Sequence, residues 1–210
     1  MPDLEPEEKI KKFGGTTTVG LVCSDGTVLA SDSRATAGYL VASKEAKKIY
    51  KVSEHIAVTT AGAVGDAEQL VELLAAEAGL YRATNGREIG VLQLARIASL
   101  VLNSQFLFPY IVNLLIGGYD TQPRLVFIDL DGTMVEEKMT ATGSGSPVAY
   151  GVLERGYRED MKVKEALPLA VEAVRTAMKR DIATGNEVQV AIITSEGVRF
   201  LTPEEIKKLA

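Results

Sequence analysis

The sequence predicts an α+β fold in which antiparallel sheets are covered by helices on their outer faces. Short apolar, β-branched runs alternate with pairs of helical segments, in the order strands, two helices, strands, two helices, strands. Asp-Gly and Glu-Gly turns join neighbouring strands directly, whereas a parallel sheet would need helical crossovers. At 210 residues with 46% hydrophobic content, the chain can bury a sizeable core as one domain.

The chain is expected to open with a β-hairpin. Residues 16–23 and 27–33 are apolar and β-branched, and Ser24-Asp25-Gly26 between them has hairpin-turn composition. Apolar residues then recur at helical spacing over 64–82 and 88–105, and Asn85-Gly86 ends the first of these helices. The other expected elements are strands at 40–42, 49–52, 56–61, 110–117, 124–130, 133–137, 188–194 and 198–201, and helices at 146–153, 163–182 and 203–209.

Composition excludes several classes of function. The net charge is -5, and no cluster of Lys and Arg interleaves with aromatic residues, so we expect no nucleic-acid surface. With only Cys23 and His55, the chain offers no internal disulfide, no Cys/His zinc cage of its own and little basis for a Ser-His-Asp triad. We expect Cys23 to be a buried, inert thiol. Neither a metal nor a cofactor is predicted.

The termini and the apolar runs indicate a cytoplasmic protein. The first fifteen residues mix acids and bases and do not resemble a secretory signal. The most apolar stretch, residues 106–118, is interrupted by Pro109 and Asn113 and is shorter than the about 20 residues that a membrane-spanning helix needs. We therefore expect no membrane span and a reducing compartment.

The charged leader stops at Gly14-Gly15-Thr16-Thr17-Thr18. A threonine hydroxyl attacks a carbonyl only if a base takes its proton, and a terminal amine with a pKa of about 7.7 to 8.0 is such a base. A chain cut before Thr16 would carry nucleophile and base on one residue. Gly15 suits such a cut, because a residue without Cβ adopts strained backbone angles. The competing interpretation is a flexible turn before a Thr-rich strand.

Two charged residues near strand ends are candidates for chemistry. Asp32 closes the second expected strand, and Lys48 precedes a later one. A buried acid and lysine would set the protonation of a nearby hydroxyl. As solvated surface charges they would have no such role, and the residues alone leave both interpretations open.

Together these segments resemble the archaeal type of the proteasome β subunit family, within the N-terminal nucleophile hydrolases, over essentially the whole chain after Gly15. The resemblance rests on the joint order and spacing of Gly15-Thr16-Thr17-Thr18-Val19-Gly20, Ser31-Asp32-Ser33-Arg34-Ala35-Thr36, Lys48, Ala61-Gly62-Ala63-Val64-Gly65-Asp66, Gly143-Ser144-Gly145 and Asp181. It implies a four-layer αββα sandwich with two antiparallel sheets flanked by helix pairs.

The resemblance also implies a role for each matching residue. Thr16 would be the nucleophile and its freed amine the general base. Lys48 would lower the pKa of the Thr16 hydroxyl, and Asp32 would keep that lysine charged and oriented. The backbone N–H of Gly62 would donate to the oxyanion.

Further positions would hold the amine and the substrate. Ser144 and Asp181 would position the terminal amine, and Thr184 stands where the family most often has serine. The main chain at Thr36 and Gly62 would pair with an extended substrate. The pocket for the residue before the cut would be lined by Ala35, Ala46, Tyr50, Thr60, Val64 and Glu68.

The implied activity is that of a threonine-type endopeptidase acting on unfolded polypeptides. Residues 1–15 would be a propeptide removed by autoprocessing between Gly15 and Thr16, which leaves a single domain of 195 residues, 16–210. The implied partners are other β subunits in seven-membered rings, capping rings of α subunits and, indirectly, an ATPase cap.

Two other hypotheses are open. Phe127-Ile128-Asp129-Leu130-Asp131-Gly132-Thr133 is similar to the phosphatase motif of the haloacid dehalogenase superfamily, in which an aspartate accepts a phosphoryl group beside magnesium. The Asp-Gly within it is also ordinary hairpin-turn composition. The second hypothesis is a ring subunit of the same fold without catalytic activity.

Overall fold

The computed structural model describes residues 15–104 and 109–209. Residues 1–14, which make up nearly all of the expected propeptide, lie outside the described part. So do the last residue of the helix expected at 88–105 and the start of the apolar stretch at 106–118. Of the described helices, none is both long and apolar enough to cross a membrane.

The first sheet holds the N-terminal hairpin at its centre. Its strands are β1 (Thr18–Cys23), β2 (Gly26–Asp32), β10 (Met139–Thr142), β11 (Val188–Thr194) and β12 (Gly197–Phe200). They lie in the spatial order β10, β1, β2, β11, β12, and each neighbouring pair is antiparallel. The predicted hairpin is confirmed, and its two strands are covered on both sides.

The second sheet is built from the middle of the chain. It contains β5 (Ile49–Ser53), β6 (Ile56–Gly62), β7 (Val112–Tyr119), β8 (Pro123–Ile128) and β9 (Met134–Glu136), which follow one another in space as they do in sequence. All neighbours are antiparallel. A separate hairpin of β3 (Ala35–Ala37) and β4 (Leu40–Ser43) leads from the first sheet toward the second.

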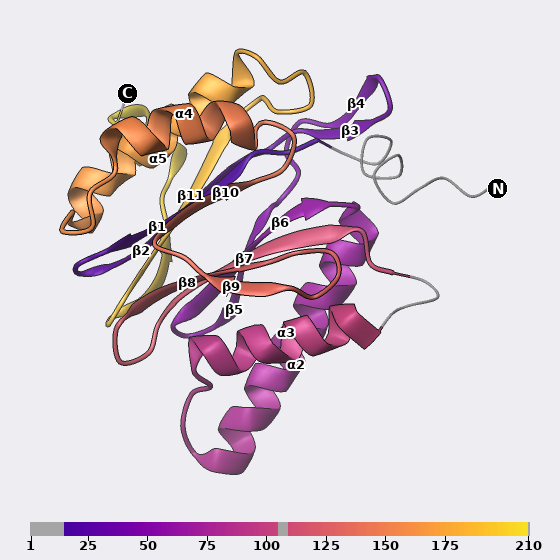
Figure 1. Cartoon of the computed structure of the whole chain (residues 1–210), viewed down its shortest axis with the longest axis vertical. Coiled ribbons are helices and arrows are strands. Elements are labelled where there is room, and N and C mark those ends of the chain that lie inside the picture. Colours follow the sequence, from indigo (N-terminus) through magenta and orange to yellow (C-terminus); the bar gives the residue numbers. More distant parts are fainter. Residues whose placement is uncertain (1–14, 105–108, 210) are drawn as a thin grey trace.

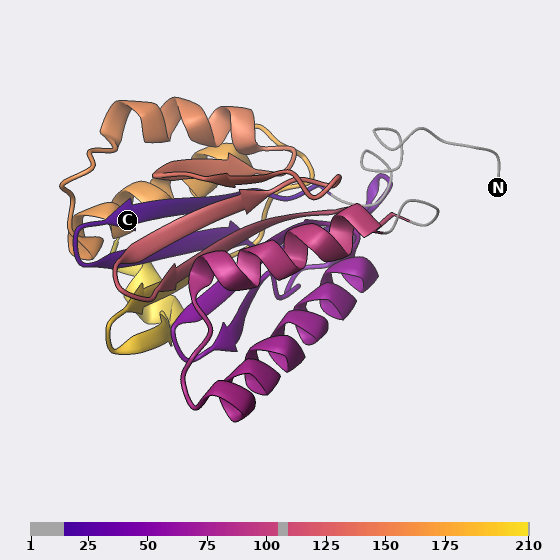
Figure 2. The same ribbon diagram turned by 60° about the horizontal axis from the view of Figure 1, so that its bottom comes forward.

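Helices cover the outer face of each sheet (Figures 1 and 2). The first sheet carries α4 (Ser146–Gly156) and α5 (Val163–Met178), and the second carries α2 (Val64–Asn85) and α3 (Val91–Ser104). The short α6 (Pro203–Lys207) follows β12. The described residues therefore form helix, sheet, sheet and helix layers, which confirms the predicted α+β sandwich.

Neighbouring side chains along an inner strand belong to different parts of the core, one part under the helices and the other between the two sheets. On β2, Val28 and Ala30 pack in the cluster under α4 and α5, whereas Leu29 packs against Leu115 of β7 in the cluster between the sheets. Successive side chains of a strand point to opposite faces, so a strand in an inner layer is buried on both. This explains why every residue of β1 and β2 is buried, instead of alternate residues being exposed.

Several predicted boundaries were wrong. The first strand begins at Thr18, not at residue 16, and the helix expected at 163–182 ends at Met178. Asp181 ends that helical region, because its carboxylate accepts from the Ala183 N–H and the Thr184 hydroxyl. Short polar side chains compete with the helix for backbone partners in this way.

Other boundaries differ by a few residues. The strand expected at 110–117 runs from Val112 to Tyr119. The helix expected at 64–82 continues to Asn85, where Gly86 closes it in the left-handed conformation with φ of 68°. Strands β3 and β10 were missed, because each is short and contains threonine and alanine instead of a long apolar run.

Replacing Leu115 by alanine tests the packing between the sheets. Leu115 is fully buried in that layer, so its truncation should lower the free energy of unfolding by about 2 to 5 kcal/mol. Urea unfolding of the two proteins measures the difference. The matched control is Leu80→Ala on α2, where the side chain is 61% exposed and the change should stay within about 0.5 kcal/mol. Equal effects of the two substitutions would contradict the assigned layers.

Candidate active site

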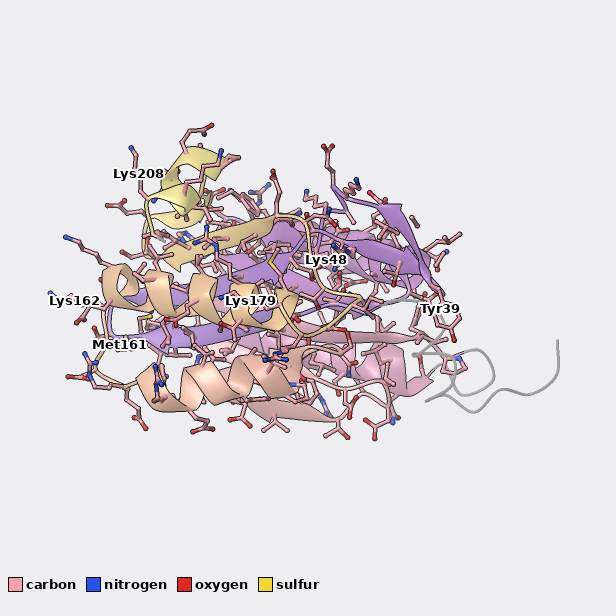
Figure 3. All side chains as sticks on the ribbon, turned by 90° about the horizontal axis from the view of Figure 1, so that it is seen from above. Tyr39, Lys48, Met161, Lys162, Lys179 and Lys208 are labelled. Carbon is pink, nitrogen blue, oxygen red and sulfur yellow. The ribbon has the colours of Figure 1, made fainter. Side chains whose placement is uncertain are left out.

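The candidate site lies where β1 begins, at one end of the sandwich. Thr16 precedes β1, Asp32 ends the neighbouring β2, and Lys48 precedes β5 of the other sheet. The three residues are 5%, 0% and 5% exposed, respectively. Figure 3 shows Lys48 within the body of the molecule, whereas Tyr39, at the tip of the β3–β4 hairpin, projects from its edge. The sequence left open whether Asp32 and Lys48 are buried or solvated, and in the structure both are buried beside Thr16.

The Lys48 ammonium joins the other two side chains. Its Nζ lies 2.6 Å from Thr16 Oγ1 and 2.8 Å from Asp32 Oδ1. A charge buried to this degree requires a partner of opposite sign, and Asp32 is that partner. The hydroxyl of Thr16 therefore accepts a charge-assisted hydrogen bond.

Backbone N–H groups hold the Asp32 carboxylate in place. Oδ1 also accepts from the Thr17 N–H at 3.0 Å, and Oδ2 accepts from the N–H groups of Arg34 at 3.0 Å and Gly185 at 2.9 Å. Both carboxylate oxygens are thus satisfied from fixed backbone positions. This fixes the point from which Asp32 orients Lys48.

Burial lowers the pKa of Lys48 below that of a solvated lysine. Desolvation is the larger influence, and the charge of Asp32 and its hydrogen bond oppose it. The ammonium beside Thr16 therefore releases its proton more readily than a surface lysine does.

A second group of hydroxyls and one carboxylate surrounds the Thr16 nitrogen. The Thr16 N–H donates to Ser144 Oγ at 3.2 Å, and the hydroxyls of Ser144 and Thr184 each donate to Asp181 Oδ2 at 2.5 Å. The Thr17 and Thr184 hydroxyls are 2.8 Å apart, and because the Thr184 proton points to Asp181, Thr17 is the donor. The chain from Thr16 through Ser144 to Asp181 orients the nitrogen beside its own hydroxyl.

Glycine is required on both sides of the Thr16 hydroxyl. A Cβ at Gly15 would lie 1.9 Å from Ala183 Cβ, so no side chain fits before Thr16. Gly62 ends β6 with φ of 143°, and a Cβ there would meet the Ile111 carbonyl oxygen at 2.1 Å. Both backbones can therefore lie close to neighbouring atoms where no side chain would fit.

A cavity lies beside Thr16, and most of the residues predicted to line a substrate pocket do line it. It is lined by the predicted Ala35, Thr36, Ala46, Tyr50, Thr60, Gly62 and Val64, and also by Gly15, Arg34, Lys47, Lys48 and Ala67. Glu68 is not among the lining residues, although its charge adds to the effect of burial in raising the pKa of Tyr50. Ala67 was missed, but its position three residues after Val64 puts both on one face of α2.

The structure does not favour the phosphatase hypothesis, because residues 127 and 128 end β8 and residues 129–133 form the turn to β9. The Gly132 N–H donates to the Asp129 carbonyl and the Asp129 N–H to the Thr133 carbonyl, both at 2.9 Å. Asp131 Oδ1 accepts from the Thr133 N–H of the same turn. The two aspartates thus hold the turn between β8 and β9 together. Among the described residues, no group of three or more His, Cys, Asp or Glu is arranged to hold a metal.

Cys23 offers no competing nucleophile. Its side chain is 2% exposed, and burial raises the pKa of the thiol to about 12. The reactive thiolate is therefore scarce at neutral pH.

Comparisons with known proteins show the family to which the chain is similar. The family described as "Proteasome subunit" matches residues 12–193. The chain is 52% identical to "Proteasome subunit beta" of Methanocaldococcus fervens over 93% of this chain and 88% of that protein. It is 50% identical to the protein of the same name from Methanosarcina barkeri, over 95% of both chains, and 47% identical to "Proteasome subunit beta 2" of Pyrococcus abyssi, over 95% and 96%.

Replacing Asp32 by alanine tests the buried ion pair. The change leaves the Lys48 ammonium without its counter-charge, so the free energy of unfolding measured in urea should fall by about 3 kcal/mol or more. Glu54→Ala is the control, because it breaks an exposed pair with Lys51 and should leave the urea midpoint almost unchanged.

The loss caused by Asp32→Ala should shrink as the pH rises toward 10.5. Without Asp32 the pKa of folded Lys48 falls further, while the unfolded lysine keeps its ordinary value of 10.5. Above the lower pKa of the variant, folded Asp32→Ala has released the Lys48 proton while folded wild type still holds it. The free energy of unfolding of the variant therefore rises relative to wild type until the pH passes the wild-type pKa of Lys48, which lies below 10.5. A loss that is constant from neutral to alkaline pH would contradict the buried charge.

Proposed function

The chain belongs to the proteasome subunit family, as a β-type protease subunit that assembles with other subunits, and we propose that it is a threonine-type endopeptidase whose nucleophile is Thr16. The observation that carries the proposal is the position of Lys48 Nζ, 2.6 Å from Thr16 Oγ1, while the Thr16 nitrogen lies 3.2 Å from Ser144 Oγ. Hydroxyl and nitrogen of one residue are thus each held by a separate polar group.

The freed amine of Thr16 serves as the general base. Its pKa of about 7.7 to 8.0 in unperturbed form lies close to neutral pH, so it accepts the hydroxyl proton directly or through one water. Lys48 stabilises the negative charge that develops on Oγ1, and Asp32 holds Lys48 against it. Ser144 and Asp181, with Thr184 behind them, keep the amine in position.

Peptide hydrolysis then proceeds through an ester. Oγ1 bonds to the substrate carbonyl carbon, and the backbone N–H of Gly62 donates to the oxyanion. When the intermediate collapses, the C–N bond breaks and the leaving amine takes the proton that the Thr16 amine had accepted. Water, deprotonated by the same amine, hydrolyses the ester and releases the second product.

The same hydroxyl removes the propeptide. Oγ1 of Thr16 bonds to the Gly15 carbonyl carbon, the Gly15–Thr16 C–N bond breaks, and the hydroxyl proton is transferred to the departing nitrogen, since the free amine does not yet exist. Water then hydrolyses the resulting ester. The enclosure of Gly15 by Ala183 and Ser144 supports this step, because it holds the preceding peptide against the site. Residues 1–15 leave, and residue 16 gains its free amine.

An extended, unfolded polypeptide fits the surroundings of Thr16. Its main chain would run along Thr36 and Gly62, and the side chain before the cut would enter the cavity lined by Ala46 and Val64. The walls are mostly small, which favours an apolar side chain. A second hollow that also contains Gly15 and Thr36 leaves room for the chain on both sides of the bond.

Membership of the family supports a proposal for the assembly. We propose seven-membered rings of β subunits that stack between rings of α subunits, with an ATPase cap supplying unfolded chains and the cytoplasm as the location. Until assembly the propeptide would keep each site blocked.

Replacing Thr16 by alanine tests the assignment of the nucleophile. The wild-type chain in assembled particles should have the mass of 195 residues, fifteen fewer than the full 210, whereas Thr16→Ala should keep all 210 and cleave no peptide. Intact-mass spectrometry and a peptide assay measure both. Thr121→Ala, at an exposed turn, is the control and should behave as wild type. A wild-type particle that keeps its leader and is inactive would instead identify a catalytically silent subunit.

The pH profile tests the charge on Lys48. Because burial lowers the pKa of Lys48, kcat should decline with rising pH at values below the 10.5 of an ordinary lysine. Lys48→Ala should reduce kcat by about 100-fold or more, because it removes the group that stabilises the charge on Oγ1; loss of one oxyanion-hole donor has an effect of this size. Lys51→Ala, on the exposed part of β5, should change neither. An activity that stays constant up to pH 10.5 would show that the Lys48 charge is not needed.

A further inference from the structure

The side chain of Gln189 connects the two sheets beside the candidate site. Gln189 lies on β11 of the first sheet, and its carboxamide reaches the segment that leads into β5 of the second. Its Oε1 accepts from the Lys48 N–H at 3.1 Å, and its Nε2 donates to the Ala46 carbonyl at 2.8 Å. One amide thus pairs with two alternate residues, as a neighbouring strand would.

Ser33, the residue after β2, makes further contacts with the same segment. Its hydroxyl donates to the Lys44 carbonyl at 2.7 Å, and its carbonyl accepts from the Ala46 N–H at 2.9 Å. Residues 44–48 belong to no strand. Their backbone groups therefore depend on Ser33 and Gln189 for these partners.

The segment held in this way carries two different functions. Lys48 contacts the Thr16 hydroxyl, and Ala46 lines the cavity beside it. The residues are two positions apart, and the same carboxamide binds both. Any shift of this segment changes the reach of Lys48 and the width of the cavity together.

We propose that Gln189 is a positioning residue that couples the placement of Lys48 to the shape of the pocket for the side chain before the cut. The inference rests on the proposed peptidase function. Gln189 does not touch the reacting atoms, and it acts through Ala46 and Lys48. Its loss should therefore alter the choice among substrates as well as the rate.

The test is a ratio of two rates in the assembled particle. Peptides that differ only by leucine or alanine before the cut are compared in wild type and Gln189→Ala. The kcat/KM ratio of leucine to alanine peptide should fall about tenfold, which at about 1.4 kcal/mol per tenfold is within the range for two lost hydrogen bonds. The ratio does not depend on how much enzyme is active, so a general loss of stability leaves it unchanged.

Removal of the leader provides an internal comparison. Gly15 has no side chain to enter the pocket, so Gln189→Ala particles should still lose residues 1–15. Gln93→Ala is the matched control, because its carboxamide also accepts from a backbone N–H, that of Gly90, but on α3 at a distance from the site. It should leave the ratio at the wild-type value.

Two further variants separate the contacts. Gln189→Met keeps the length of the side chain and removes both hydrogen bonds, so it should lower the ratio as alanine does. Gln189→Glu keeps the acceptor for the Lys48 N–H but loses the donor to Ala46, so kcat should be largely kept while KM for the leucine peptide rises. If Gln189→Ala does not assemble, Ser33→Ala tests the same segment by removing the bond to Lys44 and should also lower the ratio.

Different outcomes would refute the positioning role of Gln189 and the proposed peptidase function. A wild-type ratio in Gln189→Ala and Gln189→Met, with normal leader removal, would show that Gln189 has no positioning role. An equal fall in kcat/KM for both peptides would show that Gln189 only supports the structure, and this would also overturn the inference. A wild-type particle that cleaves neither peptide and keeps its leader would instead refute the proposed peptidase.

Discussion

The structure depends on one buried contact, the ion pair between Lys48 and Asp32 with the Thr16 hydroxyl at its end. Neither charge would be stable in this position without the other, because burial removes the water that would solvate it. The pair also requires the sandwich to close, since Asp32 ends a strand of the first sheet and Lys48 precedes a strand of the second. Folding and assembly of the site are therefore one event.

The remaining contacts hold the Lys48–Asp32 pair in a fixed position. Backbone N–H groups fix Asp32, and the Gln189 carboxamide fixes the segment that carries Lys48. Ser144, Thr184 and Asp181 form a second network on the Thr16 nitrogen. The oxygen and the nitrogen of the proposed nucleophile are thus held by different elements, and preorganised polar groups of this kind are a main source of catalytic power in enzymes.

Local sequence predicted the fold well where periodicity was strong. The N-terminal hairpin and α2, α3 and α5 have long apolar patterns, and each lies close to its predicted place. Short elements such as β3 and β10 were missed, because three or four residues contain too few repeats to establish a period. The end of α5 was misplaced, because the side chain of Asp181 competes with the helix for its hydrogen bonds.

The sequence by itself determined most of the strand and helix order, without β3 and β10, and the glycine before Thr16, because apolar period and turn chemistry are local properties. The set of polar residues for the site came from the resemblance to a family and not from these local patterns. Only the tertiary structure decided that Asp32 and Lys48 are buried as a pair and that Gln189 reaches Ala46 and Lys48 from the opposite sheet. Burial and contacts between residues 141 or 143 positions apart arise only from packing of the two sheets, and no single segment encodes them.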